Sequence, residues 1–371
     1  MSIYTTPLQF GYFLALLFAI LFWVRGVREE RLSDTLLGWI MLLLNQDLQD
    51  YTFGFSGINF LWNEMNGFPR GVGLLFGPAI YFYLRAQTNR NFKLQRKHLW
   101  HLLPWAAAFV WELSFFVQGP EVVQAYQETV LAEVMGWVGT ALYFGSWIFY
   151  FTLSIRLYRK YRSWIASQFS DLETVKLSWF RNFIYIFIAG FVFKQSMMTL
   201  DSFLDLEFYQ DFWWNYGLVA IVIYVAIKGY TQPQMVPITF DEERVEQEDE
   251  KPKPKEWDEA VRLKIVVAMA ETKLYLEPEL TLASMAKRLK VSSSQVSVTI
   301  NAAFGKNFNE FINGFRIAHF KTEVAKPENE NLTLLGVAYD CGFNSKATFN
   351  RVFKKEEGIS PKEYLSGLQT A

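Results

Sequence analysis

Two stretches near the end of the chain repeat each other and decide the fold of that region. Residues 280–300 read LTLASMAKRLKVSSSQVSVTI, and residues 332–353 read LTLLGVAYDCGFNSKATFNRVF. They superpose at a constant offset, and after one extra residue the match continues from GKNFNEF (305–311) to GISPKEY (358–364). Each copy reads as a short helix, a tight turn and a second helix opened by a Ser or Asn cap. The repeat therefore predicts two helix-turn-helix units.

A helical pattern between the two copies runs from Phe308 to Ala325 and stops before Pro327. At about 1.5 Å per residue this helix is about 27 Å long, and it would hold the two units rigidly apart. Two reading helices on one rigid chain can enter successive major grooves of B-DNA, which lie about 34 Å apart on one face. The spacing favours a bipartite DNA site.

The region from about Asp258 to Leu365 resembles the DNA-binding domain of the AraC/XylS family of bacterial transcription regulators. A duplicated helix-turn-helix that ends in GxSPxxY is a specific signature. Its residues here are, in the second copy, Ala338, Gly342-Phe343, Ser345, Phe349, Arg351, Phe353-Lys354-Lys355, Gly358, Ser360-Pro361 and Tyr364 and, in the first, Leu282, Ala286, Ser292, Ser297, Gly305, Phe308, Phe311 and Arg316-Ile317. The resemblance implies sequence-specific binding to promoter double-stranded DNA, and it leaves contact with RNA polymerase as an open question.

The resemblance covers under a third of the chain. The apolar region before it is also similar to the multi-pass N-terminal halves of some family members, through GPAIYFYLR (77–85) and HLLPW (101–105). This similarity implies a DNA-binding domain fused to a multi-pass membrane domain.

Resemblance and helical spacing together select the DNA-reading face of the second unit. Positions i, i+1, i+4 and i+5 share one side of a helix. Arginine can bind guanine or a phosphate, asparagine can pair with adenine, and lysines suit phosphates. The expected contacts are Lys346, Ala347, Asn350, Arg351, Lys354 and Lys355, whereas Phe343, Phe349 and Phe353 are expected in the core.

The first unit departs from the family pattern. Many members place arginine where this chain has Val298, and no Lys or Arg occurs from Val291 to Gly305. Its reading helix would rely on hydroxyls, an amide and apolar contact with thymine methyls. The expected contacts are Ser293, Ser294, Gln295, Ser297 and Val298. An alternative is a degenerate first unit that mainly supports the second.

Residues 256–371 carry nearly equal numbers of basic and acidic side chains, which is a thin positive balance for a DNA-binding domain. The basic residues cluster at Lys287-Arg288-Lys290 and at Arg351-Lys354-Lys355. We expect weak affinity for a single copy and a shallow salt dependence. A membrane-held homo-oligomer would offset this through effective concentration.

The region 1–230 has the composition of a membrane domain. The chain is 51% hydrophobic and only 20% charged, and every tryptophan except Trp257 lies before residue 215. Hydropathy indicates seven spans, so the expected fold is all-α, a seven-span helix bundle followed by a cytoplasmic helical domain. The spans are Leu8–Val24, Leu36–Tyr51, Gly71–Leu84, Leu99–Val117, Val130–Ile155, Phe183–Leu200 and Phe212–Ile227.

Loop charges fix an orientation, because Lys and Arg are retained on the cytoplasmic side of short loops. In 1–230 they concentrate at 25–31, 85–97, 156–181 and Lys228, and the intervening loops are acidic. Arg25, Arg28 and Arg31 follow the first apolar run, unlike the charges of a signal peptide. This pattern predicts a bacterial inner-membrane protein with its N-terminus outside and its C-terminus in the cytoplasm.

Residues 231–256 form an acidic, Lys- and Pro-containing linker without apolar periodicity. If flexible, it spans roughly 25–30 Å. The expected domains are therefore 1–230, a linker at 231–256, and 257–371.

Charged side chains within spans are costly and so indicate a functional site or a buried partner. Asp47, Glu112 and Lys194 all lie roughly 18–21 Å from the expected cytoplasmic span ends. An acid pair facing one lysine could form the pocket for a small-molecule or envelope signal. A structural ion pair and a lysine that extends toward the interface stay open as alternatives.

The sequence offers no sign of an enzyme, a metal site or a cofactor. It has one cysteine and three histidines, too few for a disulfide framework or a zinc cage, and no nucleophile elbow, P-loop, GxGxxG or HExxH motif. The favoured function is a membrane-embedded transcription regulator that senses a signal with its spans. The alternative is a transporter-like or structural membrane protein whose tail no longer reads DNA.

Overall fold

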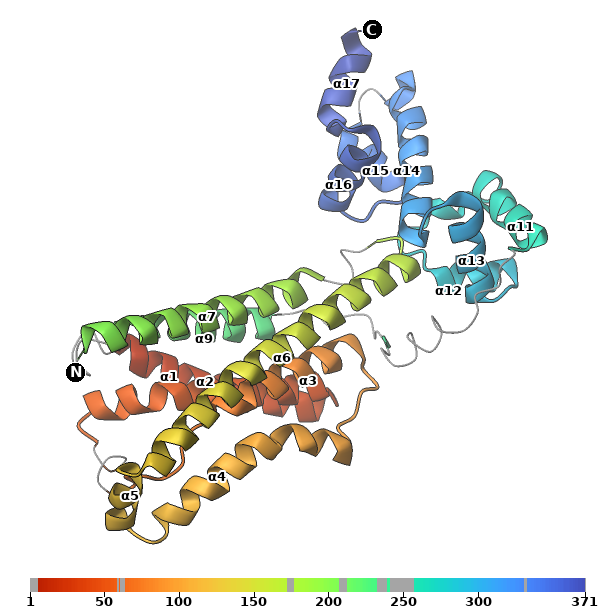
Figure 1. Cartoon of the computed structure of the whole chain (residues 1–371). Coiled ribbons are helices and arrows are strands. Elements are labelled where there is room, and N and C mark those ends of the chain that lie inside the picture. Colours follow the sequence, from red (N-terminus) through yellow and green to blue (C-terminus); the bar gives the residue numbers. More distant parts are fainter. Residues whose placement is uncertain are drawn as a thin grey trace. The chain divides into compact units, whose positions relative to one another are not determined.

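The computed structural model describes residues 6–58, 60, 64–171, 177–206, 212–231, 239–240, 257–329 and 332–370, and every regular element within them is helical (Figure 1). The chain forms two compact units. The first is Met1–Tyr158 with Ser178–Thr239, and the second is Arg159–Leu177 with Phe240–Ala371. The expected linker at 231–256 lies outside the described residues except for 231, 239 and 240.

The first unit is a bundle in which α2 is central. Helix α2 packs against α1, α3 and α9, and half of its residues are buried. The unit's elements are α1 (Thr6–Arg28), α2 (Leu32–Phe55), α3 (Gly73–Thr88), η1 (Arg96–Leu102), α4 (Leu103–Phe116), α5 (Pro120–Gln127), residues 130–158 of α6 (Val130–Gln168), α7 (Leu177–Leu204) from residue 178 on, η2 (Phe212–Trp214) and α9 (Asn215–Tyr230).

The expected count of seven spans is wrong. Within the described residues, four helices are long and apolar enough to cross a membrane, Thr6–Arg28, Val130–Gln168, Trp179–Leu204 and Phe212–Tyr230. A bent pair, Arg96–Phe116 with Pro120–Gln127, makes a fifth if it counts as one span.

Two of the expected spans have a different explanation. The segment 36–51 lies in α2, which buries polar side chains such as Asp34 and Asn45 inside the bundle. The segment 71–84 lies largely in α3, whose 16 residues reach only about 24 Å, less than the hydrocarbon thickness of about 30 Å. Hydropathy alone does not distinguish a buried bundle helix from a span.

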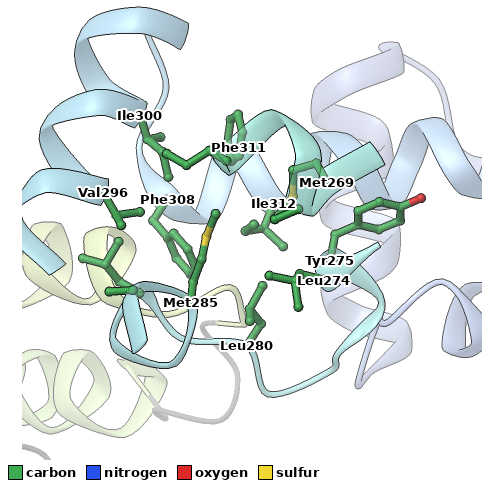
Figure 2. Packing of buried hydrophobic residues seen from close by; sticks show 14 of the residues in the cluster. Met269, Leu274, Tyr275, Leu280, Met285, Val296, Ile300, Phe308, Phe311 and Ile312 are labelled. Carbon is green, nitrogen blue, oxygen red and sulfur yellow. The ribbon is translucent and has the colours of Figure 1, made fainter. Parts of the chain in front are cut away.

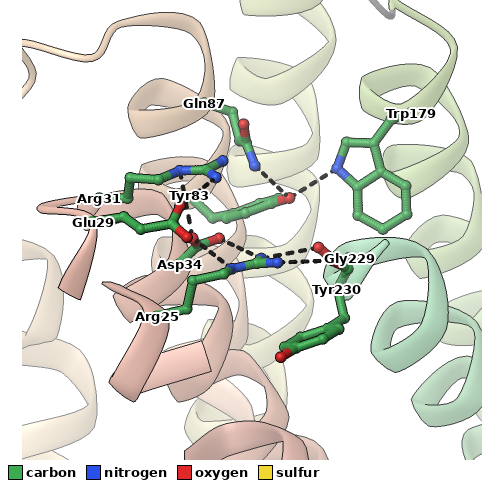
Figure 3. Close-up of polar contacts among 9 residues, drawn as sticks. All are labelled: Arg25, Glu29, Arg31, Asp34, Tyr83, Gln87, Trp179, Gly229 and Tyr230. Atoms are coloured by element: carbon green, nitrogen blue, oxygen red, sulfur yellow. Dashed lines mark hydrogen bonds and ion pairs between the residues drawn. The ribbon is translucent and has the colours of Figure 1, made fainter. Parts of the chain in front are cut away.

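The end of α1 is held by the guanidinium of Arg25 (Figure 3). Its Nε and Nη2 donate to Asp34 Oδ2 and Oδ1 at 2.9 and 2.8 Å, and the Asp34 side chain is only 1% exposed. Nη2 and Nη1 also donate to the carbonyls of Gly229 and Tyr230 at 3.0 and 2.8 Å. A cation is favourable at the carbonyl end of a helix. One side chain thus joins α1, α2 and α9.

A second polar contact joins α3 to α7. The hydroxyl of Tyr83, a fully buried residue, accepts hydrogen bonds from Trp179 Nε1 at 2.8 Å and from Gln87 Nε2 at 3.0 Å (Figure 3). The two contacts leave this hydroxyl well satisfied in the bundle interior, as buried polar groups require.

The second unit contains two pairs of short helices joined by a long helix. Its elements are α11 (Glu259–Ala270), η3 (Leu274–Leu276), α12 (Leu282–Leu289), α13 (Ser293–Phe304), α14 (Phe308–Val324), η4 (Pro327–Asn329), α15 (Leu334–Asp340), α16 (Lys346–Glu357) and α17 (Pro361–Thr370). The two pairs, the connecting helix and the helix before them match the sequence prediction closely.

Local sequence explains where these helices begin. A side-chain oxygen before each of five helices accepts a hydrogen bond from a backbone N–H of the first turn, which contributes about 1 kcal/mol per cap. The capping residues are Thr281, Ser292, Asn307, Thr333 and Ser345.

Helix α14 belongs to both hydrophobic cores of the second unit. Its first half places Phe308, Phe311 and Ile312 in the core around α11, α12 and α13 (Figure 2). Its second half places Ile317 and Phe320 in the core around α15 and α16. The two pairs therefore share one rigid element.

The turn between α15 and α16 lies tightly against η3. Gly342 has φ +90°, and a Cβ at this position would lie 2.7 Å from the carbonyl oxygen of Tyr275. Gly358 also has a positive φ, +78°, but a Cβ there would meet no atom within 4 Å. The first glycine is required for both conformation and space, the second for conformation alone.

We expect Gly342→Ala to destabilise the second unit by about 2–4 kcal/mol, through left-handed strain and a backbone clash. Gly358→Ala should cost only about 1 kcal/mol because it adds strain alone. The measurement is the urea midpoint for labelling Cys341, the chain's one cysteine, which is fully buried and whose thiol pKa burial raises to about 12. Equal midpoints for the two variants would contradict the clash.

Candidate nucleic-acid interface

Helix α16 has one exposed and one buried side. The six residues expected to contact DNA, Lys346, Ala347, Asn350, Arg351, Lys354 and Lys355, are all exposed. The buried side holds Thr348, Phe349, Val352 and Phe353, and the expected core positions of Phe343, Phe349 and Phe353 are confirmed.

The cations on the exposed side differ in their partners. Lys355 Nζ donates to Glu310 Oε1 at 2.6 Å, and this contact lowers the pKa of that carboxyl below its usual value. No ion pair among the described residues involves Arg351. Arg351 is therefore the better candidate for a base or phosphate contact, and Lys355 is already partly neutralised.

Helix α13 presents a neutral surface. Of the expected contacts, Ser294 and Gln295 are exposed, whereas Ser293, Ser297 and Val298 are half-buried. The Gln295 carboxamide oxygen accepts from the backbone N–H and the hydroxyl of Ser292 at 3.0 and 2.9 Å. This capping box uses the side chain that was expected to read a base. The adjacent cations of α12, Lys287 and Arg288, are exposed.

An arginine without an assigned role lies at the centre of the second unit. Arg316 on α14 is fully buried. Its Nε donates to the Tyr275 carbonyl at 2.7 Å, and its Nη2 donates to the Glu277 carbonyl at 2.6 Å and to Ser170 Oγ at 3.1 Å. Burial lowers its pKa to about 10, against the opposing effect of Asp171, so the group stays charged at neutral pH.

Residues Phe169–Asp171, here named the anchor segment, follow α6 directly and pack within the second unit. The Ser170 hydroxyl donates to the Leu280 carbonyl at 2.7 Å. The Ser170 carbonyl accepts from the side-chain amides of Asn309 at 2.7 Å and Asn313 at 3.0 Å. The anchor segment thus contacts the start of the first helix pair and the connecting helix α14.

The anchor segment also contacts the second helix pair. Thr348 Oγ1, in the first turn of α16, donates to Asp171 Oδ1 at 3.1 Å. Ser170 and Asp171 are 1% and 4% exposed. On the last turns of α6, the rings of Tyr161 and Trp164 pack against the buried Phe240. The sequence placed residues 159–171 with the membrane region, but they complete the interior of the C-terminal unit.

The expected sensing residues come together only in part. Lys194 Nζ on α7 lies 2.7 Å from Asp47 Oδ2 on α2. Both residues line a cavity of about 670 Å³ within the first unit. Glu112 lies on α4, is exposed, and does not line that cavity. The described residues hold no group of three or more His, Cys, Asp or Glu that could bind a metal ion.

Comparisons with known proteins agree with the helix-turn-helix geometry. Residues 285–367 match a family described as a helix-turn-helix domain. Relatives in Staphylococcus aureus strains COL, MSSA476 and N315 are each described as an uncharacterized HTH-type transcriptional regulator. Each is 30% identical over 91 residues, which is 24% of this chain and 12% of the relative. The chain thus spans about an eighth of these relatives' length, and no solved structure matches it significantly.

We expect Arg316→Lys to destabilise the second unit by at least about 2 kcal/mol. A lysine ammonium does not reproduce the planar set of N–H donors of the guanidinium, so buried carbonyls lose their hydrogen bonds. The matched control is Arg262→Lys, at a surface ion pair with Glu259, where the urea midpoint should hardly change. Cys341 labelling in urea measures both. A small effect at Arg316 would show that the buried contacts do not stabilise the unit.

Proposed function

We propose that the chain is a membrane-embedded bacterial transcription regulator, which binds promoter DNA through its two helix-turn-helix pairs under the control of its apolar helices. The observation that carries the proposal is the path of α6. This helix runs without a break from Val130 to Gln168, and its residues 130–158 belong to the first unit and 159–168 to the second. A helix long and apolar enough to cross a membrane thus ends inside the unit that resembles a DNA-binding domain.

The surface of the first unit supports a place in the bilayer. Large apolar side chains on its candidate spans are exposed, among them Phe13 on α1 at 62%, Trp137 on α6 at 70% and Phe203 on α7 at 82%. Large apolar side chains exposed on several helices are unfavourable in water and suit lipid. The basic clusters at 25–31 and 156–162 favour the cytoplasm for the end of α1 and the end of α6.

In the proposed DNA complex α16 supplies most of the electrostatic affinity. Arg351, Lys346 and Lys354 are exposed on one side of this helix, whereas α13 offers only hydroxyls, an amide and Val298. Specificity at the first half-site would depend on neutral contacts and on DNA shape. A second copy on the same promoter would raise the effective concentration of reading helices.

A conformational change in the first unit would be transmitted to the DNA-binding unit through α6 rather than through the linker at 231–256. The anchor segment hydrogen-bonds to Leu280, Asn309, Asn313, Arg316 and Thr348, so it touches both helix pairs and α14. A shift or rotation of α6 would therefore act on the start of the first helix pair, on α14 and on α16 at once. A ligand produces such a shift only if its affinity differs between two arrangements of the spans.

The direct test is genome-wide DNA immunoprecipitation of the full-length protein from membrane fractions. We expect discrete promoter peaks. Arg351→Ala should weaken binding by about 1–3 kcal/mol and relax preference at one position if Arg351 contacts a base. Lys355→Ala is the matched control and should have a smaller effect, because Lys355 is already paired with Glu310. Absence of promoter peaks would favour the alternative, a membrane protein whose tail no longer reads DNA.

The path of control is tested by paired insertions of Gly-Ser-Gly-Ser. Lys194→Met alone should shift promoter output, because it breaks the Asp47–Lys194 pair. An insertion after Tyr158 interrupts α6 between the units and should abolish this shift. The same insertion after Gln247, in the linker, should preserve it. Promoter output and the amount of protein in the membrane are measured for each variant, and the reverse pattern would assign control to the linker.

A further inference from the structure

The cavity in the first unit has apolar walls built by six elements. Its lining comes from α2, α3, α6, α7, η2 and α9, and it includes Phe76, Trp147 and Phe191. These three rings contact one another in series. The Phe76 and Trp147 rings are stacked with centroids 5.8 Å apart, and the Trp147 and Phe191 rings are tilted with centroids 4.7 Å apart. A volume of about 670 Å³ lies within the range of roughly 300–1,000 Å³ that is usual for small-molecule sites.

The polar groups of this cavity are few and specific. Lys194 and Asp47 form the ion pair at 2.7 Å, and Gln195 Nε2 donates to Tyr143 Oη at 3.5 Å. Asn215 also lines the cavity and is 6% exposed, and its Nδ2 is buried without a hydrogen-bond partner among the described residues. An unsatisfied buried donor is destabilising, and an acceptor on a ligand would remove that cost.

The charges of the site restrict what can bind there. Asp47 and Lys194 neutralise each other. A ligand with a single charge would bind one of them and leave the other unpaired in apolar surroundings, which is strongly unfavourable. A ligand with both charges exchanges one ion pair for two, and the side-chain amide of Asn215 is a further donor among the lining residues.

We propose that the cavity binds a small amphipathic zwitterion, with its ammonium group beside Asp47, its carboxylate or phosphate beside Lys194, and its apolar body among the aromatic walls. This inference deepens the proposed function, and rests on it only in treating the occupied cavity as the input. The same chemistry is carried by an apolar dipeptide from the aqueous phase and by phosphatidylethanolamine from the bilayer.

Two glycines of α6 provide a matched pair of variants. Gly139 lines the cavity, and a Cβ built there meets no atom within 4 Å. Gly136 lies one turn earlier, has equally open space at its Cβ, and does not line the cavity. Gly139→Leu should therefore add a side chain that starts in open space beside the cavity, whereas Gly136→Leu adds the same side chain elsewhere on the same helix.

Calorimetry on the full-length protein in phosphatidylglycerol nanodiscs tests the aqueous source. The probes are Phe-Phe, N-acetyl-Phe-Phe and Phe-Phe amide, which share one apolar body and are zwitterionic, anionic and cationic. We expect Phe-Phe to bind about tenfold or more tightly than either analogue. Gly139→Leu should abolish its binding, Asn215→Leu should weaken it, and Gly136→Leu should leave it unchanged.

Native mass spectrometry of the protein from mixed phosphatidylglycerol and phosphatidylethanolamine nanodiscs tests the lipid source. Retention of phosphatidylethanolamine that is lost in Gly139→Leu and kept in Gly136→Leu would support the lipid. Specific binding detected by either calorimetry or mass spectrometry supports the proposal. The proposal would be overturned if the three probes bind equally, if a singly charged probe binds more tightly, or if binding is insensitive to Gly139→Leu. It would also be overturned if neither calorimetry nor mass spectrometry detects binding.

These measurements contain no DNA, so their outcome is separate from that of the promoter experiment. Promoter peaks without zwitterion binding would refute the ligand assignment and leave the proposed function intact. Zwitterion binding without promoter peaks would refute the proposed function and leave the binding site.

Discussion

The buried guanidinium of Arg316 ties the parts of the C-terminal unit to each other. Taking a charge of this kind out of water costs several kcal/mol unless its hydrogen bonds are satisfied. Its acceptors come from the η3 region and from Ser170, and the ring of Phe343 lies 5.8 Å from the guanidinium carbon. Because each acceptor must be in place for the charge to be tolerated, the first helix pair, the second helix pair and the anchor segment adopt their positions together.

Much of the fold of the second unit follows from short-range signals in the sequence. The duplicated pattern, the caps at Ser292 and Ser345 and the stop before Pro327 all depend on residues within a few positions of each other, and these elements lie where they were expected. The anchor segment gives no such signal. Ser170 and Asp171 are polar residues after a long helix, and their partners lie more than 100 residues away.

The first unit shows a different limit of sequence reasoning. Apolar composition indicates burial but not whether lipid or protein surrounds a helix, so α2, with buried Asp34 and Asn45, was counted as a span. Depth along a helix placed Asp47, Glu112 and Lys194 at one level. Depth does not fix the direction in which a side chain points around its helix. Asp47 and Lys194 therefore meet, whereas Glu112 lies on α4, which buries none of its residues.

The same difference between local and distant contacts applies to α13 and α16. The helical periodicity of α16 correctly predicts which of its side chains are exposed and which are buried, because the spacing of residues along the helix determines the side on which each one lies. The partner of Lys355, Glu310, is distant in sequence, and the capping role of Gln295 competes with a role in base recognition. Whether a polar side chain is available to a ligand thus depends on its hydrogen bonds and ion pairs with other residues, which helical periodicity does not predict.

The continuity of α6 has a consequence for gene location under the proposed function. Its ten residues beyond Tyr158 extend about 15 Å, and the anchor segment follows at once. A regulator covalently attached through α6 to a unit in the bilayer cannot search the nucleoid, so the target gene has to diffuse to the cell periphery. Transcription would then depend on where a locus lies in the chromosome's three-dimensional arrangement as well as on its sequence, and genes whose products are inserted into the membrane during synthesis would be brought within reach by their own expression.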